Sequence, residues 1–141
     1  MELNEFIKQF PDYQTSFEDQ NLGEQKGNYA MYILINKSLG MQKGKIAAQA
    51  GHAVQKMTEY CVKNCPDVWY NYNQSNIPKI TLQVKTEDQM RDILTETKDI
   101  IKSYVIDEGR TQIKQNSLTA VAFIPMDKSN APKCFKDLKL F

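Results

Sequence analysis

The most constraining feature of this 141-residue sequence is the stretch Gly40 to Val54, GMQKGKIAAQAGHAV. Its first half reads as a loop with lysines around a glycine, and its second half as a helix with few bulky side chains. Lys45, Gln49 and His52 are spaced at i, i+4 and i+7, so they share one polar face. The other face is apolar, as an amphipathic helix requires, and carries Ile46, Ala50, Ala53, Val54 and Met57. Its alanines would let the helix pack closely on a sheet and hold the polar face rigidly.

Two lysines fall in the first turn of this predicted helix. Lys43 and Lys45 oppose the helix dipole, which favours negative charge at an N-terminus. Together with the free backbone N–H groups they would form a site for an anion. The alternative is a solvated helix start whose lysines extend into water, and the spacing alone leaves both interpretations open.

Composition bounds the class of protein. Hydrophobic residues make up 41% and charged residues 25% of the chain, which is ordinary for a globular protein of one domain. The sequence has neither an apolar run of about 18 residues nor a secretory signal pattern, so we expect a cytoplasmic protein that does not enter membranes. Three cysteines and one histidine support neither a disulfide framework nor a zinc site, so we expect reduced thiols and no metal.

The net charge of +1 hides an asymmetry between the two ends of the chain. Residues 1–27 hold six acids and two lysines, a net charge of −4, whereas the other 114 residues hold 16 bases and 11 acids, a net charge of +5. We therefore predict an acidic N-terminal extension over 1–27, either loose or with one short helix around Leu3 to Phe10, and a folded domain over 28–141. A basic domain suits an anionic partner, although +5 also serves solubility.

The pattern of apolar residues predicts alternating strands and helices. Tyr29 to Ile35 reads as a buried central strand, and the helix after it should reach about Asn64, where Pro66 stops it. Asp67 to Asn76 reads as an irregular loop. A second strand over Lys79 to Val84 precedes a helix that Thr86 and Gln89 cap and that keeps helical spacing to Ile101. Two further strands follow at Ser103 to Ile106 and Ala120 to Ile124, and a brief helix and an apolar anchor close the chain at Leu138, Leu140 and Phe141.

This order predicts an α/β fold: a single small domain with a mixed four-stranded sheet and helices on both faces. In such sheets ligands bind where strands end and helices begin. Lys45 follows the first strand and Asp107 follows the third, so the two side chains share an edge if those strands are parallel. Asp107 opens a thirteen-residue loop to Thr119, which is too long for a tight hairpin and therefore a functional candidate.

Several segments together resemble the peptidyl-tRNA hydrolase family of the archaeal and eukaryotic type. They are KGKIAAQAGHA, the strand that begins PKI at Pro78, DEGRTQI, LTAVAFIP and the closing LKLF, and the similarity runs from about Asn28 to Phe141. Two departures exist. Where the family usually has an Arg-x-Asp-Leu run, this chain has Asn36 to Leu39, and Gln115 and Asn116 replace a usual Pro-Gly.

The resemblance implies hydrolysis of the ester that joins a peptide to the terminal ribose of tRNA. The family's functional positions correspond here to Lys45, Gln49, Asp107, Thr111 and Thr119. Asp107 would orient or deprotonate a water molecule and Lys45 would stabilise the oxyanion or hold the carboxylate. Thr111 and Thr119 would hydrogen-bond water and substrate, and Gln49 would position the ester or the lysine. No cofactor, metal or covalent intermediate is needed.

The expected partner is tRNA, bound mainly through phosphates by cations near the site: Lys37, Lys43, Lys56, Arg110 and Lys114. The resemblance also makes a homodimer plausible. His52 is a weaker candidate for a general base, because about two helical turns, roughly 10 Å, separate it from Lys45, and we expect it to pack or bind elsewhere.

Two other functions compete with hydrolysis. The departures at Asn36 to Leu39 and at Gln115 and Asn116 motivate a non-catalytic RNA-binding or adaptor domain on the same scaffold. A thiol protein that uses Cys61 and Cys65 is the weakest alternative, because their spacing is not that of the usual two-residue redox motif.

Overall fold

The central strand of the domain is β1 (Tyr29–Asn36), in which every residue after the first is buried. The computed structural model describes residues 1–10, 27–108 and 116–141. The strand order is β2-β1-β4-β3, formed with β2 (Lys79–Val84), β3 (Lys102–Ile106) and β4 (Leu118–Phe123). β1 and β2 are parallel, and β4 is antiparallel to both β1 and β3. β1 and β3 therefore point the same way and end at the same edge of the sheet.

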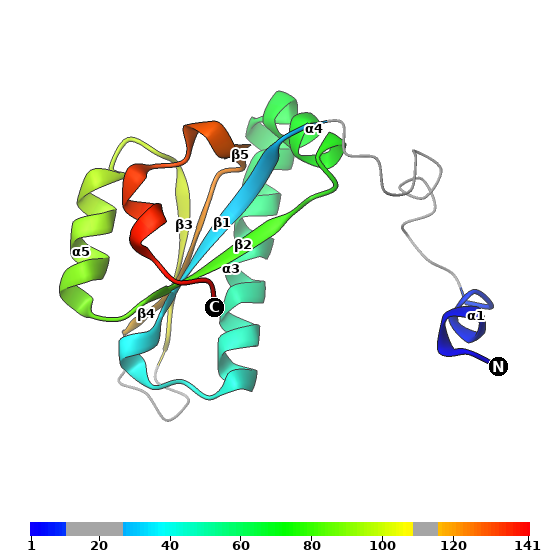
Figure 1. Ribbon diagram of the computed structural model, residues 1–141, viewed down its shortest axis with the longest axis horizontal. Coiled ribbons are helices and arrows are strands. Elements are labelled where there is room, and N and C mark those ends of the chain that lie inside the picture. The colour runs from blue at the N-terminus through cyan, green and yellow to red at the C-terminus, as the bar shows by residue number, and fades with distance from the viewer. Residues whose placement is uncertain (11–26, 109–115) are drawn as a thin grey trace.

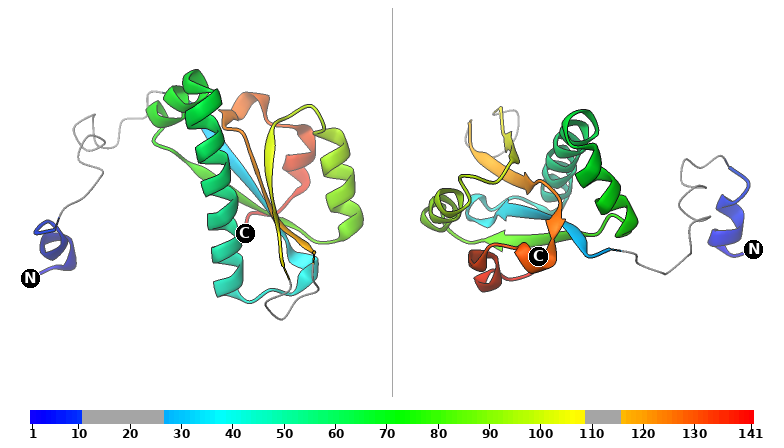
Figure 2. Two further views of the ribbon diagram at one scale, coloured as in Figure 1. Left: turned by 180° about the vertical axis from the view of Figure 1, so that it is seen from behind. Right: turned by 90° about the horizontal axis from the view of Figure 1, so that it is seen from above.

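Helices cover both faces of this sheet (Figures 1 and 2). The long helix α3 (Lys43–Asn64) and the short helix α4 (Pro66–Gln74) cover one face, and α5 (Glu87–Glu96) covers the other together with the 3-10 turn η3 (Lys133–Asp137). Two hydrophobic clusters fill the layers. The cluster under α3 and α4 includes Met31, Ile33, Ile35, Ala53, Met57, Cys61, Tyr72 and Val105, and that under α5 and η3 includes Tyr32, Leu34, Leu82, Met90, Ile93 and Phe135. The predicted fold class is confirmed.

The sheet carries one strand more than the sequence predicts. The two-residue strand β5 (Met126–Asp127) pairs with the first two residues of β1, and it leads into the 3-10 turn η2 (Lys128–Asn130). Two residues are too few for an alternating pattern to be visible in the sequence.

The predicted loop over Asp67 to Asn76 is wrong, because most of it forms α4. Pro66 stands at the start of that helix, where its missing N–H costs nothing, so it opens α4 as well as ending α3. Tyr72 is 1% exposed, and its ring lies 5.8 Å from that of Trp69. Burial of these aromatic rings outweighs the low helix propensity of the neighbouring asparagines.

The capped second helix is confirmed, but it is shorter than expected. The Thr86 hydroxyl accepts a hydrogen bond from the Gln89 N–H at 3.0 Å, and the Gln89 side chain accepts one from the Lys85 N–H at 2.8 Å. This is a variant of the capping box in which Gln89 bonds back to the residue before the N-cap Thr86 instead of to Thr86 itself. The helix ends at Glu96 instead of continuing to Ile101, and the Lys102 ammonium donates to the carbonyls of Thr97 and Ile100 in the turn that follows.

The predicted C-terminal anchor is confirmed for Leu138, which packs against the core cluster, but not for Leu140 and Phe141. Phe135 in η3 is 4% exposed, and its ring lies 5.0 Å from those of Tyr32 and Phe123. Leu140 and Phe141 are instead 70% and 48% exposed. They are held by backbone contacts along the edge of β2, where the Phe141 N–H donates to the Thr81 carbonyl.

The N-terminal segment forms the short helix α1 (Leu3–Ile7), which falls within the range where a helix was expected. All ten described residues of this segment are exposed. The remainder of the predicted acidic extension, up to residue 26, lies outside the described residues. In the part of the chain that the structure describes, no helix is both long and apolar enough to cross a membrane.

Candidate active site

Lys45 and Asp107 meet at the edge where β1 and β3 end. The Lys45 Nζ lies 2.8 Å from the Asp107 Oδ1, and the two side chains are 22% and 6% exposed. The geometry arises because α3 starts directly after the β1 turn, while Asp107 directly follows β3. The convergence predicted from the sequence is therefore confirmed. The carboxylate also offsets the unfavourable interaction of Lys45 with the helix dipole.

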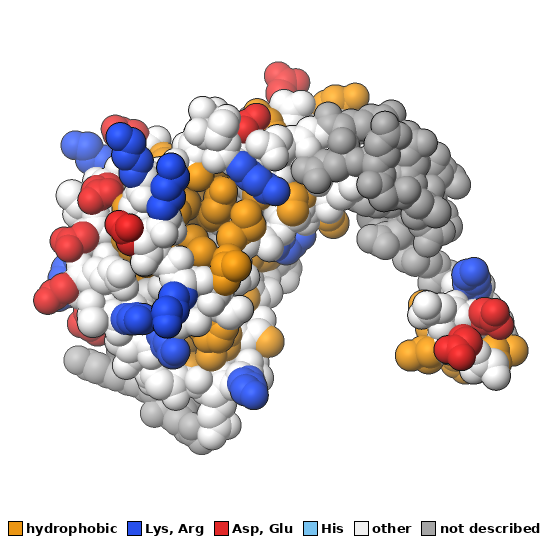
Figure 3. Space-filling model, viewed as in Figure 1, with side chains coloured by type: hydrophobic (Ala, Val, Ile, Leu, Met, Phe, Trp, Pro, Cys, Tyr) orange, Lys and Arg blue, Asp and Glu red, His pale blue; other side chains and the backbone are white. Residues whose placement is uncertain are grey.

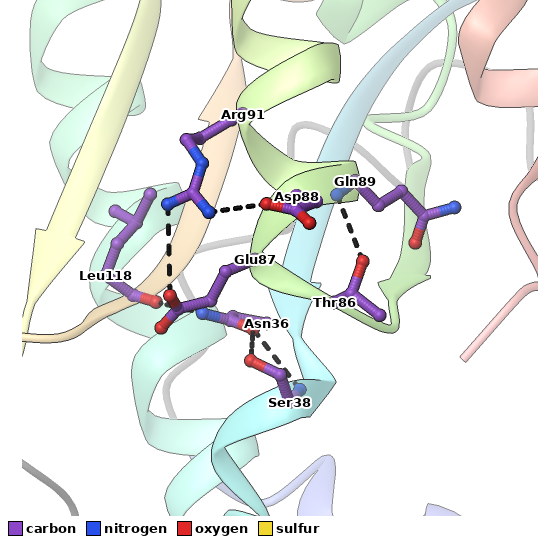
Figure 4. Close-up of polar contacts among 8 residues, drawn as sticks. All are labelled: Asn36, Ser38, Thr86, Glu87, Asp88, Gln89, Arg91 and Leu118. Carbon is purple, nitrogen blue, oxygen red and sulfur yellow. Dashed lines mark hydrogen bonds and ion pairs between the residues drawn. The ribbon is translucent and has the colours of Figure 1, made fainter.

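Hydrogen bonds of the buried Asn36 side chain stabilise the turn between β1 and α3 (Figure 4). The sequence departs from the family pattern at this residue. The Asn36 side chain donates to the Leu118 carbonyl at 2.8 Å and accepts from the N–H and hydroxyl of Ser38 at 3.2 and 2.6 Å. These bonds cap the 3-10 turn η1 (Lys37–Leu39), which Gly40 ends with a φ of 65°. These side-chain hydrogen bonds fix the turn that precedes α3, and so they fix the start of the helix that carries Lys45.

The loop that begins at Asp107 is closed at its base by backbone hydrogen bonds. The Asp107 N–H donates to the Ser117 carbonyl at 2.9 Å, and the Asn116 N–H donates to the Asp107 carbonyl at 2.7 Å. Asn116 has a φ of 64°, a conformation that asparagine tolerates better than most residues. Three predicted site residues of this loop, Arg110, Thr111 and Lys114, lie outside the described residues.

Gln49 and Thr119 form a buried chain of hydrogen bonds behind the ion pair. The Gln49 amide donates to the Thr119 hydroxyl at 2.8 Å, and that hydroxyl donates to the Val105 carbonyl at 3.0 Å. Gln49 is 5% exposed and Thr119 is fully buried. The Thr119 hydroxyl therefore bonds inside the protein instead of contacting water or substrate as the sequence suggested. Its position links α3 to β3 and β4, which orients the helix face that carries Lys45.

A cleft of about 370 Å³ opens beside the ion pair. It is lined by residues from α3 and from the end of β3: Lys45, Gln49, His52, Val105, Ile106, Asp107 and Glu108. At roughly 30 Å³ for each water molecule, this volume admits several waters or part of a larger ligand. The carboxylate of Asp107 is thus paired with Lys45 but also borders a space that solvent can enter.

His52 lies on this cleft, which sequence reasoning did not expect. The side chain is exposed, and it comes from the same face of α3 as Lys45 and Gln49. The i+7 spacing already placed it on that face. What the sequence could not show is that the cleft runs along α3 for two turns instead of closing at the ion pair.

The predicted tRNA-binding lysines do not gather at one point. The Lys37 ammonium donates to the Gln83 side chain of β2 at 3.1 Å, and the Lys56 ammonium donates to the Tyr104 carbonyl of β3 at 2.7 Å. Lys43 is exposed at the start of α3. Lysine and arginine side chains are spread over the face seen in Figure 3, around an apolar area. Among the described residues, no group of three or more histidine, cysteine, aspartate or glutamate side chains could hold a metal ion.

Comparison with known proteins adds a finding independent of this geometry. The family model described as "Peptidyl-tRNA hydrolase PTH2" matches residues 29–141, which include every described side chain of the candidate site. The chain belongs to the PTH2 family. The match begins at the first residue of β1, in agreement with the resemblance seen in the sequence.

Three named relatives are each about one-third identical to this chain. A Dictyostelium discoideum protein named "Probable peptidyl-tRNA hydrolase 2" is 31% identical over 132 residues, 92% of this chain and 60% of that protein. The mouse protein named "Peptidyl-tRNA hydrolase 2, mitochondrial" is 33% identical over 116 residues, 81% of this chain and 64% of the mouse protein. A Methanococcus maripaludis "Peptidyl-tRNA hydrolase" is 36% identical over 121 residues, 79% of this chain and 98% of the archaeal protein.

The chain thus spans less than two thirds of the first two PTH2 relatives but nearly all of the archaeal one. The mouse relative is named as mitochondrial, so relatives do not share one stated location, and the cytoplasmic location expected from the sequence stays a prediction.

Proposed function

We propose that this protein hydrolyses the ester bond of peptidyl-tRNA and releases free tRNA and peptide. The observation that carries the proposal is the Lys45–Asp107 pair, 2.8 Å apart on the wall of an open cleft, in a chain of the PTH2 family. An ester is already activated, so a positioned water and a group that stabilises negative charge suffice to cleave it.

In this mechanism Asp107 is the general base. Its carboxylate takes a proton from a water molecule in the cleft while the water oxygen attacks the ester carbonyl carbon. A tetrahedral oxyanion forms, and the bond between this carbon and the ribose oxygen then breaks. The proton held by Asp107 passes to the ribose oxygen, which leaves as the terminal hydroxyl of tRNA. The peptide leaves as a carboxylic acid, which gives its remaining proton to solvent and becomes a carboxylate.

Lys45 supplies the positive charge for this reaction. An ammonium has three N–H donors, of which one is directed to Asp107, so a second can reach the carbonyl oxygen of the ester. Negative charge develops on that oxygen in the transition state, and a donor already in place stabilises it without reorganisation. The same ammonium holds the Asp107 carboxylate in a fixed orientation.

Gln49 and Thr119 act as positioning residues. Their hydrogen bonds to each other and to the Val105 carbonyl hold α3 at a fixed distance from β3, and this distance sets the Lys45–Asp107 separation. Thr111 follows Asp107 by four residues, and we propose, from the family resemblance, that its hydroxyl contacts the attacking water or the substrate.

The tRNA would be bound through its phosphates by Lys37, Lys43 and Lys56, and by Arg110 and Lys114 of the loop. Contacts of this kind hold the nucleic acid without reading its sequence, which suits an enzyme that accepts many tRNAs. A homodimer and a cytoplasmic location remain part of this proposal.

A cleavage assay with two substrates tests the function. The chain is incubated with an N-blocked aminoacyl-tRNA, which mimics peptidyl-tRNA, and separately with free aminoacyl-tRNA. We expect release of tRNA from the first and little from the second. Binding of the blocked substrate without turnover would contradict hydrolysis and favour the RNA-binding or adaptor domain instead.

A further inference from the structure

The polar stripe of α3 extends beyond the ion pair. At about 100° per residue, Lys45, His52 and Lys56 lie within about 40° of one another around the helix axis. At a rise of 1.5 Å per residue, His52 lies roughly 10 Å and Lys56 roughly 16 Å along the axis from Lys45. The cleft follows the first part of this stripe, from Lys45 past Gln49 to His52. The wall of the cleft therefore presents an ammonium and then an imidazole, and the same face of α3 carries a second ammonium one turn beyond His52.

The imidazole of His52 is available to a ligand. It is exposed on the cleft, and it forms no hydrogen bond, ion pair or ring contact with another described residue. A histidine that only supported the fold would pack against the core or bond to a neighbouring backbone group, as Gln49 does on the same face. The planar ring of His52 instead borders open volume.

Lys56 also keeps binding capacity. Its ammonium donates to the neutral carbonyl of Tyr104, and it forms no ion pair within the described residues. Its charge is therefore not neutralised by a carboxylate, and two of its three N–H donors remain for an anion. The contact with Tyr104 also holds the ammonium at the edge of β3, on the same side of α3 as the cleft.

We propose that His52 and Lys56 form the subsite for the 3′-terminal nucleotide of tRNA. The imidazole stacks on the base and the ammonium of Lys56 binds the 5′-phosphate of that nucleotide, while the ester at its ribose reaches Lys45 and Asp107. This proposal rests on the proposed function, because it takes the ester to lie at the ion pair.

The chemistry of the two groups favours the nucleotide over the peptide as the occupant. Every nucleotide carries an aromatic base and a phosphate in a fixed relation, and histidine rings stack on bases as other aromatic side chains do. A peptide of variable sequence offers neither a constant aromatic face nor a constant anion. An aromatic ring and a cation in line with the reactive pair therefore match the part of the substrate that is the same in every tRNA.

The single histidine of the chain gives a direct test, because its ring protons in an NMR spectrum belong to one residue. The intact chain is titrated with adenosine 5′-monophosphate and, separately, with ribose 5-phosphate, which lacks the base. We expect the His52 ring protons to move upfield with the nucleotide, as stacking requires, and to stay nearly unmoved with the sugar phosphate. In Lys56→Ala the nucleotide should bind several-fold more weakly. Equal shifts with both ligands, or none at millimolar nucleotide, would overturn the proposal.

Kinetics of blocked aminoacyl-tRNA provide the second test. We expect His52→Ala to raise KM about ten- to a hundredfold with a smaller change in kcat, since base stacking contributes to binding in that range. His52→Phe, which keeps an aromatic ring, should recover most of the loss. A substrate whose terminal nucleotide lacks its base should be impaired with the wild-type chain but little further impaired with His52→Ala.

A matched control is Gln55→Ala, an exposed polar residue of α3 outside the cleft, which should leave KM unchanged.

The outcomes separate the hydrolase proposal from the nucleotide-subsite proposal. A wild-type chain that cleaves no ester but shows the nucleotide-specific shift of His52 would refute the hydrolase and keep the nucleotide subsite. A chain that cleaves the ester while His52→Ala matches wild type in KM would refute the subsite and keep the hydrolase.

Discussion

The ammonium of Lys45 lies 2.8 Å from the carboxylate of Asp107, although the two residues are 62 positions apart in the chain. They meet because β1 and β3 point in the same direction, with the antiparallel strand β4 between them. The Asp107 carboxylate is only 6% exposed, and burial of a charged group costs desolvation free energy. An opposite charge and well-placed hydrogen bonds are needed to offset that cost. The place of the ion pair on an open cleft is one reason why we propose that the pair acts in catalysis.

Removal of either charge should abolish most of the activity and leave the fold. We expect Lys45→Ala and Asp107→Asn each to lower kcat/KM on the order of 10²- to 10³-fold, the usual loss for one electrostatic group in a preorganised site. Initial rates on blocked aminoacyl-tRNA measure this, and circular dichroism confirms that the fold is retained. Folded variants with near-normal rates would show that the assigned roles are wrong.

Thr119→Val should weaken the fold and, through it, the site. The substitution keeps the shape of the side chain but removes the hydroxyl that joins the Gln49 amide to the Val105 carbonyl. Because these groups are buried, we expect the free energy of unfolding to fall by about 1–3 kcal/mol and kcat to fall with it. Thr119→Ser is the matched control, and urea unfolding should show that it stays close to wild type. A Thr119→Val variant as stable as wild type, with a loss only in Thr119→Ser, would mean that the methyl group and not the hydroxyl matters.

Much of this site could be predicted from the sequence, because each half of it follows a strong local pattern. The buried run of β1 and the alternation in β2 identify strands, and ligand sites in α/β sheets lie where strands end, so Lys45 and Asp107 were natural candidates. The family resemblance added Gln49, Thr111 and Thr119. The length of the cleft depends instead on how α3 lies against β3, so the place of His52 on its wall could not be read from spacing.

Other features escaped prediction because tertiary packing decides them. α4 forms from a segment of low helix propensity because Tyr72 fills the space beside α3. Likewise, Phe135 rather than Phe141 packs in the core, although both are apolar residues near the C-terminus. Asn36 departs from the family pattern, and only the structure shows that its side chain bridges β1 to β4. In each case the residue that is contacted is distant in the chain, so no local sequence pattern predicts the contact.

Tyr72→Phe should stabilise the domain. The Tyr72 ring is buried, and its hydroxyl has no hydrogen-bond partner within the described residues. Burial, and to a lesser extent the nearby Cys61, raises the pKa of this phenol. Removal of the hydroxyl ends an uncompensated desolvation cost, so we expect the free energy of unfolding to rise by about 1 kcal/mol. The ring and its contact with the Lys79 ammonium, 5.4 Å from the ring centroid, are kept. Loss of stability on urea unfolding would instead indicate a bonded hydroxyl.

Cys61 should make the domain less stable at alkaline pH. Burial, with a smaller effect of Cys65, raises the pKa of the Cys61 thiol from 9.0 to about 11. The folded state thus favours the protonated thiol, so this contribution is fully present below pH 9 and is lost as the pH rises from 9 to about 11. Urea midpoints at pH 8, 9, 10 and 11 measure the decline. Cys61→Ala should lower stability at every pH, but its stability should decline less between pH 9 and 11 than that of the wild-type chain. An equally steep decline in both chains would exclude the Cys61 thiol as its cause.

Binding of tRNA should weaken steeply as salt increases, because the proposed contacts are between lysines and phosphates. Each phosphate contact adds about 0.7 to 0.9 to the slope of log K against log salt concentration, so Lys43→Ala and Lys56→Ala should each reduce the slope by about that amount. The loss should be similar for different tRNAs, since phosphate contacts do not read sequence. Binding is measured by fluorescence anisotropy over a range of salt concentrations.

Lys133→Ala is the control for this measurement. Lys133 is exposed in η3, which covers the face of the sheet opposite α3, so its loss should change neither the affinity nor the slope. If all three variants reduce the slope equally, tRNA is attracted by the net charge of the domain and not by the side of it that carries the cleft. A slope near zero in the wild-type chain would contradict phosphate contacts altogether, and the proposed tRNA-binding lysines would have to be abandoned even if the ester is cleaved.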